Sequence, residues 1–204
     1  MSFDVAQKIA DAVLYEGYLL YPYRASSDKN RVRFQFGVVA PQDHSLADGS
    51  ETWEMQTEIL LETGPAAEVD IRVRFLQLQA RDVEAADPAA PTGFAPAPSL
   101  TVDGGDLLSW EEATEAQVDV GAVSIAELLA EAREVPFRIA GDEQIEVVTS
   151  SDGRPAGRIV RTRWQIDGRL VLTCEAVESY VRLGVRVENL TTSPPGTMRR
   201  EEAL

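Results

Sequence analysis

The sequence predicts a mainly β protein of the α+β class, an antiparallel sheet or sandwich of about seven strands with two short helices. Three observations support this fold class. Apolar and polar residues alternate over several runs, turn-forming residues separate the runs, and two segments show helical periodicity. The predicted strands span 31–38, 55–61, 69–78, 144–149, 158–166, 169–177 and 180–189.

The two predicted helices each begin at a capping residue. Ser2 and Asp4 can cap a first helix whose apolar residues recur at helical spacing and which ends near Gly17. Ser124 and Glu127 form a capping box, which opens a second helix that ends before Pro136. We expect the second helix to lie on the sheet.

The early strands predict a half-buried sheet. In the run 31–38, Val and Phe residues occupy one face and Arg and Gln residues the other. Residues 42–50 then read as a polar loop. The runs 55–61 and 69–78 should pair as a hairpin, because Gly64 and Pro65 lie between them.

The later strands predict a β-meander. Short polar segments separate the four runs after the second helix, and Asp167-Gly168 is the sharpest hairpin signal in the chain. We therefore expect one composite domain of four parts. These are a helix with three strands (1–86), a linker or long loop rich in Pro, Ala, Gly and acidic residues (87–122), a helix with four strands (123–192), and a tail resembling a truncated helix (193–204).

Charge and composition exclude several function classes. The chain has 204 residues with 34 acidic and 19 basic side chains, and its net charge of −15 disfavours nucleic acid and anionic membranes as partners. Twelve acidic residues and two arginines lie between Asp103 and Glu146, a solvated face or a docking surface for a basic partner. With one cysteine and no signal-peptide pattern or long apolar run, we expect a cytoplasmic protein.

The densest cluster of binding-type residues lies between the first helix and the first strand, in the segment YEGYLLYPYRASSDKN. Tyrosine rings with a polar tip and a planar guanidinium are typical of protein interaction surfaces. The candidate partner-binding residues are Tyr15, Tyr18, Tyr21, Tyr23, Arg24, Lys29 and Asn30. In the alternative interpretation, Tyr15, Tyr18 and Tyr21 anchor the helix to the sheet while the basic residues are solvated.

No residue pattern indicates catalysis, a cofactor or a metal. His44 lies near acidic residues, but one histidine cannot supply a usual transition-metal site, and the spacing of the acids differs from that of a calcium-binding loop. Cys174 occupies a core-facing strand position, where burial raises the pKa of a thiol. Asp103-Gly-Gly-Asp106 falls in the predicted linker, not between a strand and a helix as a phosphate loop would.

The segment YEGYLLYPYRASSDKNRVRFQFGVVAP resembles a family of uncharacterised proteins encoded beside the genes of [NiFe] uptake hydrogenases, chiefly in actinobacteria. The resemblance extends more weakly to TWEMQTEILLE, VDIRVRFLQLQARDVE and MRREEAL. Members of that family are longer and continue beyond the equivalent of MRREEAL. The resemblance implies an accessory part in hydrogenase assembly or organisation, with no established catalytic role to carry over.

Three hypotheses follow from the sequence. The first is a non-catalytic accessory or assembly protein of a hydrogenase system, which binds a hydrogenase subunit or maturation factor. The second is an enzyme with a small-molecule pocket lined by the sheet, and the third is a structural subunit that self-associates through an exposed strand edge.

Overall fold

The computed structural model describes residues 3–20, 38–49, 51–64 and 66–192, and within them the chain is mainly β with antiparallel sheets, as predicted. The helices are α1 (Asp4–Leu20), α2 (Gln42–Asp48) and α3 (Ile125–Ala130). The strands are β1 (Glu54–Leu61), β2 (Glu68–Ala86), β3 (Phe94–Ala97), β4 (Ser99–Val102), β5 (Gly105–Leu108), β6 (Trp110–Ser124), β7 (Arg133–Ile139), β8 (Asp142–Thr149), β9 (Pro155–Arg163), β10 (Ile166–Val177) and β11 (Tyr180–Asn189).

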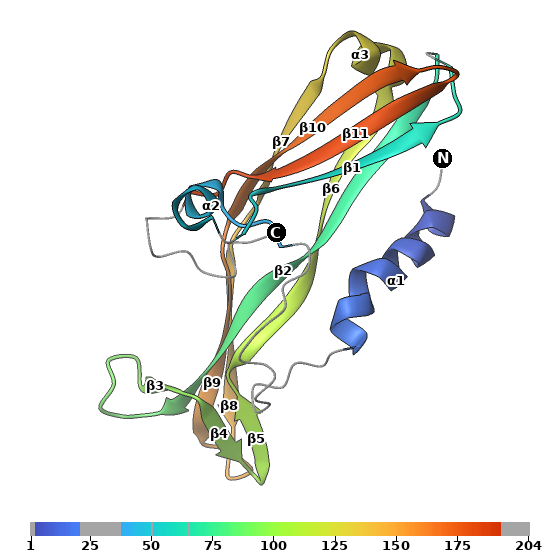
Figure 1. The fold of residues 1–204 in the computed structure, drawn as a ribbon. Helices are drawn as coiled ribbons and strands as arrows, with labels where there is room; N and C mark the ends of the chain where they lie inside the picture. Colours follow the sequence, from blue (N-terminus) through green and yellow to red (C-terminus); the bar gives the residue numbers. More distant parts are fainter. Residues whose placement is uncertain (1–2, 21–37, 50, 65, 193–204) are drawn as a thin grey trace.

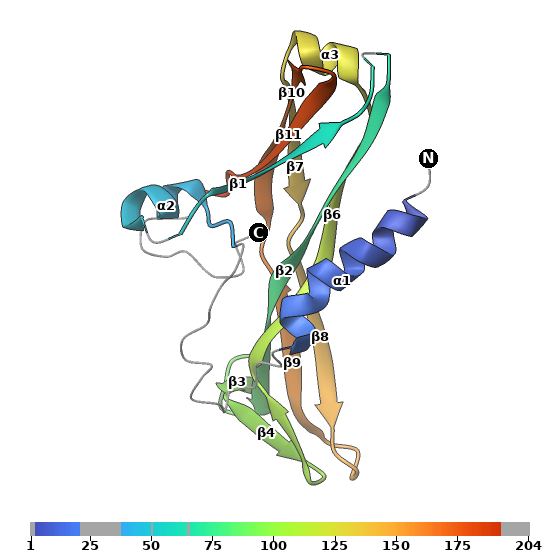
Figure 2. The ribbon, with the colours of Figure 1, turned by 45° about the vertical axis from the view of Figure 1, so that its right-hand side comes forward.

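The described strands form two larger sheets and one separate hairpin, and the long strand β2 belongs to the second sheet. The first sheet has the order β1-β11-β10-β7, and the second has the order β3-β2-β9-β8, with β6 also paired to β2. Figure 1 shows an elongated molecule in which β2 and β6 run side by side along most of its length. Helix α3 lies at one end, and the hairpin of β4 and β5 lies at the other (Figure 2).

The hydrophobic core fills the space between the β2–β6 ribbon and the first sheet. Ile71 of β2 and Val118 of β6 are buried in one cluster with Leu170, Leu172 and Leu183 of β10 and β11. Apolar residues on alternate positions of four strands thus share one dry interior.

Helix α3 closes the end of this core as the capping box predicts. The Ser124 hydroxyl accepts a hydrogen bond from the Glu127 backbone N–H at 3.5 Å, and Ile125 and Leu128 are buried beneath the helix. The helix ends at Ala130, and the next residue, Glu131, has extended backbone angles.

The prediction that residues 87–122 form a linker or long loop is wrong. Residues 87–122 contain β3, β4, β5 and most of β6. Asp103 and Gly104 have φ values of 50° and 84° and join β4 to β5 through a two-residue turn. Asp-Gly is a preferred sequence for such a turn, because both central residues adopt left-handed angles. The strand signal was weak because β4 and β5 are only four residues each.

The predicted hairpin of 55–61 with 69–78 is also wrong. β1 pairs with β11 along its whole length, whereas β2 pairs with β6 over Glu68–Arg81. The two strands are neighbours in sequence but belong to different sheets. The alternation of apolar residues identified each strand correctly, yet it carries no information about which other strand provides the hydrogen-bonding partner.

The predicted four-stranded meander separates into two hairpins. β8 pairs with β9 in one sheet and β10 pairs with β11 in the other, so the chain changes sheet at Trp164 and Gln165. Asp167-Gly168 lies within β10 rather than in a turn, which corrects the strongest hairpin signal of the sequence. Gly168 has a packing role instead, because it lies beneath the ring of Phe137 on β7.

The N-terminal part differs from expectation in two elements. Helix α1 continues to Leu20, past the predicted end near Gly17. Residues 42–48 form helix α2 rather than a polar loop, and Gly49 ends it with a φ of 68° and donates its N–H to the Ser45 carbonyl. Residues 31–37 of the first predicted strand and the predicted tail from 193 onward lie outside the described residues.

Candidate functional site

Two of the seven predicted partner-binding residues lie in the part of the chain that the structure describes. Tyr15 and Tyr18 belong to helix α1, and the other five, Tyr21, Tyr23, Arg24, Lys29 and Asn30, lie outside the described residues. The helix that leads into this segment is attached to β2. Asp11 forms an ion pair with Arg74 at 2.6 Å, and Arg72 lies 4.6 Å from the ring centre of Phe3. The first part of the chain, before the aromatic segment, is therefore attached to β2.

The surroundings of His44 and Cys174 do not indicate a reactive site. His44 lies in helix α2, and the part of the chain that the structure describes has no group of three or more His, Cys, Asp or Glu arranged to hold a metal ion. Cys174 is half-buried against the core, and burial raises the pKa of its thiol, as the sequence predicted. A raised pKa keeps the thiol protonated and poorly nucleophilic at neutral pH.

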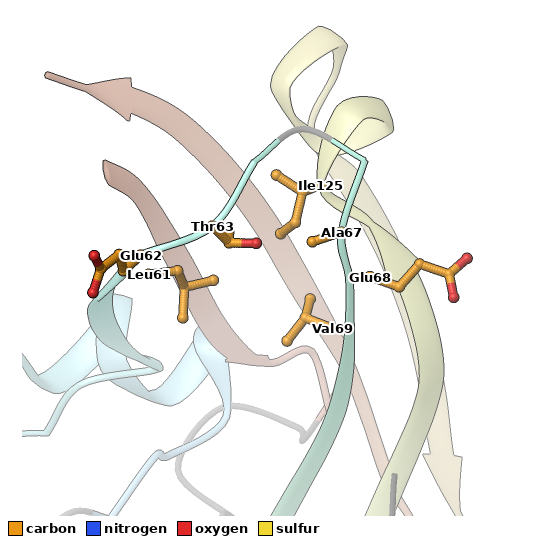
Figure 3. A pocket seen from close by; sticks show the side chains of 7 residues that line it. All are labelled: Leu61, Glu62, Thr63, Ala67, Glu68, Val69 and Ile125. Atoms are coloured by element: carbon orange, nitrogen blue, oxygen red, sulfur yellow. The ribbon is translucent and has the colours of Figure 1, made fainter. Parts of the chain in front are cut away.

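A small cavity lies where β1 and β2 diverge below α3. It has a volume of about 210 Å³ and is lined by Leu61, Glu62, Thr63, Ala67, Glu68, Val69 and Ile125. Figure 3 shows the apolar side chains of Leu61, Val69 and Ile125 pointing into the space, while both carboxylates point away from it. The Thr63 hydroxyl is the one polar side-chain group in this view that faces Ile125. Ligand pockets are usually larger and contain several converging polar groups, so this cavity does not resemble one.

Among the described strands, β1 lies at one end of the first sheet and carries exposed apolar side chains. β1 pairs with β11 on one side and ends the order of its sheet. Met55, Ile59 and Leu60 are 44%, 48% and 62% exposed. Figures 1 and 2 show β1 at the margin of the sheet, with the α2 region beside its beginning. Exposed apolar side chains on an edge strand favour pairing with another strand.

The polar face of this sheet forms an ion-pair ladder. We use this name for Glu54 and Glu58 of β1, Arg182, Arg186 and Glu188 of β11, Arg169 and Glu175 of β10, and Glu134 of β7. Arg186 lies 3.5 Å from Glu54 and 2.8 Å from Glu188, and Arg169 lies 3.0 Å from Glu134. Cross-strand pairs of opposite charge stabilise antiparallel sheets. The ladder ends at β1 in carboxylates.

A second row of this ladder reaches the same edge. Arg182 forms an ion pair with Glu175 and lies 3.9 Å from Glu58. The hydrogen bond to Glu175, followed by the charges of Glu175 and Glu58, raises the pKa of Arg182 above its usual value. Glu54 and Glu58 on β1 therefore each form an ion pair with an arginine on β11.

The strand β8 ends the second sheet and also carries exposed apolar residues, Ile145 at 53% and Val147 at 55%. Asp142 and Glu146 on the same strand form ion pairs with Arg163 and Arg161 of β9 at 3.1 and 2.9 Å. The two sheets thus each end in an acidic, partly apolar strand.

Sequence reasoning identified β1 as a strand but missed it as a candidate site. The alternation of Met55 and Ile59 with Glu54 and Glu58 was visible in the sequence, but whether a strand lies inside a sheet or at its edge depends on pairing. The ion pairs that tie Glu54 and Glu58 to β11 join residues more than 100 positions apart, which no local pattern encodes.

Within the described residues, no helix is both long and apolar enough to cross a membrane. Comparison of the chain with protein-family models, with curated proteins and with solved structures found no match.

Proposed function

We propose that this chain is a non-catalytic accessory or assembly protein that acts in the cytoplasm by binding another protein. The observation that carries the proposal is the position of β1 at the end of its sheet among the described strands, together with the exposed apolar side chains that it carries. An exposed edge strand is a template for adding a strand from another chain, a common way for proteins to bind extended peptides.

The identity of the binding partner is proposed from the sequence. The resemblance of the segment from Tyr15 to Asn30 and of its flanks to proteins encoded beside [NiFe] hydrogenase genes points to a hydrogenase subunit or maturation factor. The net charge of −15 supports a basic partner surface, since complementary charge accelerates association and selects partners.

The test is affinity purification of the tagged full-length protein from its native host, followed by mass spectrometry. Enrichment of a hydrogenase subunit or maturation factor, lost at high salt, is the expected result. A deletion strain with complete hydrogenase activity and normal assembly would contradict the hydrogenase assignment.

Self-association is a second candidate function, because β8, like β1, ends its sheet among the described strands and carries exposed apolar residues. Sedimentation equilibrium distinguishes the two candidates. A mass that rises with protein concentration supports self-association, and a constant monomer mass supports binding to a different protein.

A further inference from the structure

We infer that residues 31–37 of this chain pair with β1 as an added antiparallel strand, so that the first sheet ends in the chain's own segment. The pairing goes beyond the proposed function, because it belongs to the chain alone and can be measured without a partner. Residues 31–37 lie outside the described residues. The support comes from the described residues that follow them, from the side chains of β1 and from the sequence RVRFQFG.

The chain that follows the segment is fixed at the start of β1. The Ala40 N–H donates to the Thr52 carbonyl at 2.8 Å. The Val39 carbonyl accepts a hydrogen bond from the Asn189 side-chain amide at 2.9 Å. Val39 and Ala40 are 3% and 0% exposed. Because β11 pairs with β1 along its whole length, a strand that extends from Ala40 along β1 takes the other side of β1.

The connection between Ala40 and Thr52 favours an antiparallel pair within one chain. Helix α2 and Gly49, with a φ of 68°, reverse the chain between these two residues, as the turn of a hairpin does. Strands joined by a short connection pair at a lower entropic cost than strands of separate molecules, because the connection holds them at a high effective concentration. This favours the chain's own segment over a strand from another protein.

The register decides which face of the sheet each side chain joins. Continued without interruption from the Ala40–Thr52 bond, the pairing would place the arginines of the segment on the core side of β1. A bulge of one extra residue at Gly37 shifts the register and exchanges the two faces. Arg33 then lies opposite Glu58, on the polar face. Glycine within a strand often marks a bulge, so Gly37 suits this position.

The polar face of β1 matches the arginines of the segment in the shifted register. Glu58 lies 3.9 Å from Arg182 of β11, which also pairs with Glu175 of β10. The sign of the charge thus alternates over three neighbouring strands, and Arg33 on a fourth strand continues the alternation. Glu58 is 48% exposed, so its carboxylate is accessible to a second cation. Pairs of opposite charge on neighbouring strands stabilise antiparallel sheets.

The core side of β1 matches the apolar residues of the segment. Met55 and Ile59 are 44% and 48% exposed, although their partners on β11 belong to the hydrophobic core or pack against it. In the shifted register Phe36 lies opposite Met55. Val32 lies opposite Ile59. Burial of these side chains against one another removes apolar surface from water and extends the dry face of the sheet by one strand.

The pairing joins two candidate interaction features in one surface. Residues 31–37 follow directly after Lys29 and Asn30, the last of the candidate partner-binding residues. As the end strand of the first sheet, residues 31–37 bring this segment to the Leu60 end of β1. A partner then meets the end strand and the aromatic segment together.

The experiment uses the purified chain with Cys174→Ser and two new cysteines, Gln35→Cys and Gln56→Cys. Positions 35 and 56 lie opposite each other in the shifted register, at a separation that a disulfide can span. The matched control combines Gln35→Cys with Thr57→Cys, because positions 35 and 57 lie opposite each other only in the uninterrupted register. Disulfide formation in a glutathione buffer is followed by mass spectrometry. We expect the first pair to form an intramolecular disulfide at least about tenfold faster than the control pair.

The other results of this experiment contradict the inference in different ways. Faster closure between positions 35 and 57 would overturn the shifted register. Equally slow closure of both cysteine pairs would overturn the pairing of the segment with β1. Disulfides between two molecules in place of the intramolecular one would assign this side of β1 to a second copy and overturn the inference as well.

Charge variants test the pair of Arg33 and Glu58. In the first cysteine variant, Arg33→Glu should slow disulfide closure about threefold, since it brings two carboxylates together. Arg31→Glu is the matched control, because Arg31 lies opposite the apolar Leu60 in the shifted register, and it should change the rate less than about 1.5-fold. Equal slowing in both variants would reduce the effect to net charge and overturn the assignment of Arg33 to Glu58.

The unsubstituted chain provides a test that does not depend on the folding of any variant. Nuclear Overhauser effects are expected between backbone protons of Arg33 and Glu58, because directly opposite residues of antiparallel strands lie about 5 Å apart between their Cα atoms. The absence of such effects in a folded, assigned sample would overturn the pairing. Failed pairing with intact co-purification refutes the pairing alone, and confirmed pairing without any co-purified protein refutes the accessory role alone.

Discussion

The ring of Phe137 on β7 covers Gly168 on β10 so closely that a Cβ built on the glycine would lie 2.2 Å from the phenylalanine Cζ. The two residues are cross-strand partners in the first sheet. The same Cβ would lie 2.8 Å from the Glu188 carbonyl oxygen of β11. A glycine within a strand is often retained for such a close approach, and here it leaves room for the Phe137 ring.

Gly168→Ala should therefore lower the free energy of unfolding by about 2 kcal/mol, because the added methyl group overpacks the site. Urea denaturation of the purified variant measures the change. In a Phe137→Leu background the same substitution should cost less, since part of the clash is with the ring. Gly64→Ala is the control with open space around the glycine, and an equal loss there would refute the packing explanation.

The carboxylate of Glu188 is 1% exposed and accepts hydrogen bonds from Arg169 at 2.7 Å and Arg186 at 2.8 Å. Glu188→Gln should lower the free energy of unfolding by about 2 kcal/mol, because the substitution removes the negative charge shared by both guanidinium groups and replaces one acceptor oxygen with an amide donor. The value lies below that for a fully buried pair, since the two arginines are 31% and 37% exposed.

Glu175→Gln is the matched control for this prediction. Glu175 belongs to the same ladder and pairs with Arg182, but its side chain is 64% exposed. The substitution should change the free energy of unfolding by less than about 0.5 kcal/mol. Similar losses for the Glu175 and Glu188 variants in chemical denaturation would show that burial does not distinguish them.

The sequence was sufficient to predict local structure where one signal dominates. Ser124 and Glu127 predicted the start of α3, and the alternation in 180–189 predicted β11 with its bounds. The sequence was not sufficient for pairing. Gly168 carried the sharpest turn signal, yet its role depends on Phe137, 31 positions earlier in the sequence, and this contact arises only when β7 and β10 pair.

The candidate site was less predictable than the fold. Tyrosine and arginine density drew attention to the segment from Tyr15 to Asn30, which is a compositional signal. β1 has ordinary strand composition, and among the described strands it has one neighbour where β11 has two. Position in a sheet results from the pairing of all strands, so a local pattern cannot reveal it.

The turn between β10 and β11 holds Glu178 with a φ of 53°, a left-handed angle that costs a side chain about 1 kcal/mol. Glu178→Gly should raise the free energy of unfolding by about 0.5 kcal/mol, because relief of this strain outweighs the greater freedom of glycine in the unfolded chain. Chemical denaturation measures the gain. Ser179→Gly, at the neighbouring turn position without a positive φ, should lower stability, and a gain there would contradict the explanation.

Asp142 on β8 has a pKa below its usual value of 3.8, because its carboxylate accepts a hydrogen bond from Gln144 and a second one from Arg163. Both bonds favour the charged form, so the stability they contribute is present above the usual pKa and is lost as the pH falls through the lowered one. NMR titration of the Asp142 carboxyl carbon should give a midpoint below 3.8, and Gln144→Leu should move it upward. Asp152, whose pKa is lowered by the Ser150 hydroxyl and the Arg154 backbone N–H, is the internal reference. An upward shift of both midpoints in the Gln144 variant would indicate a general change of the β8–β9 hairpin rather than loss of the bond to Asp142.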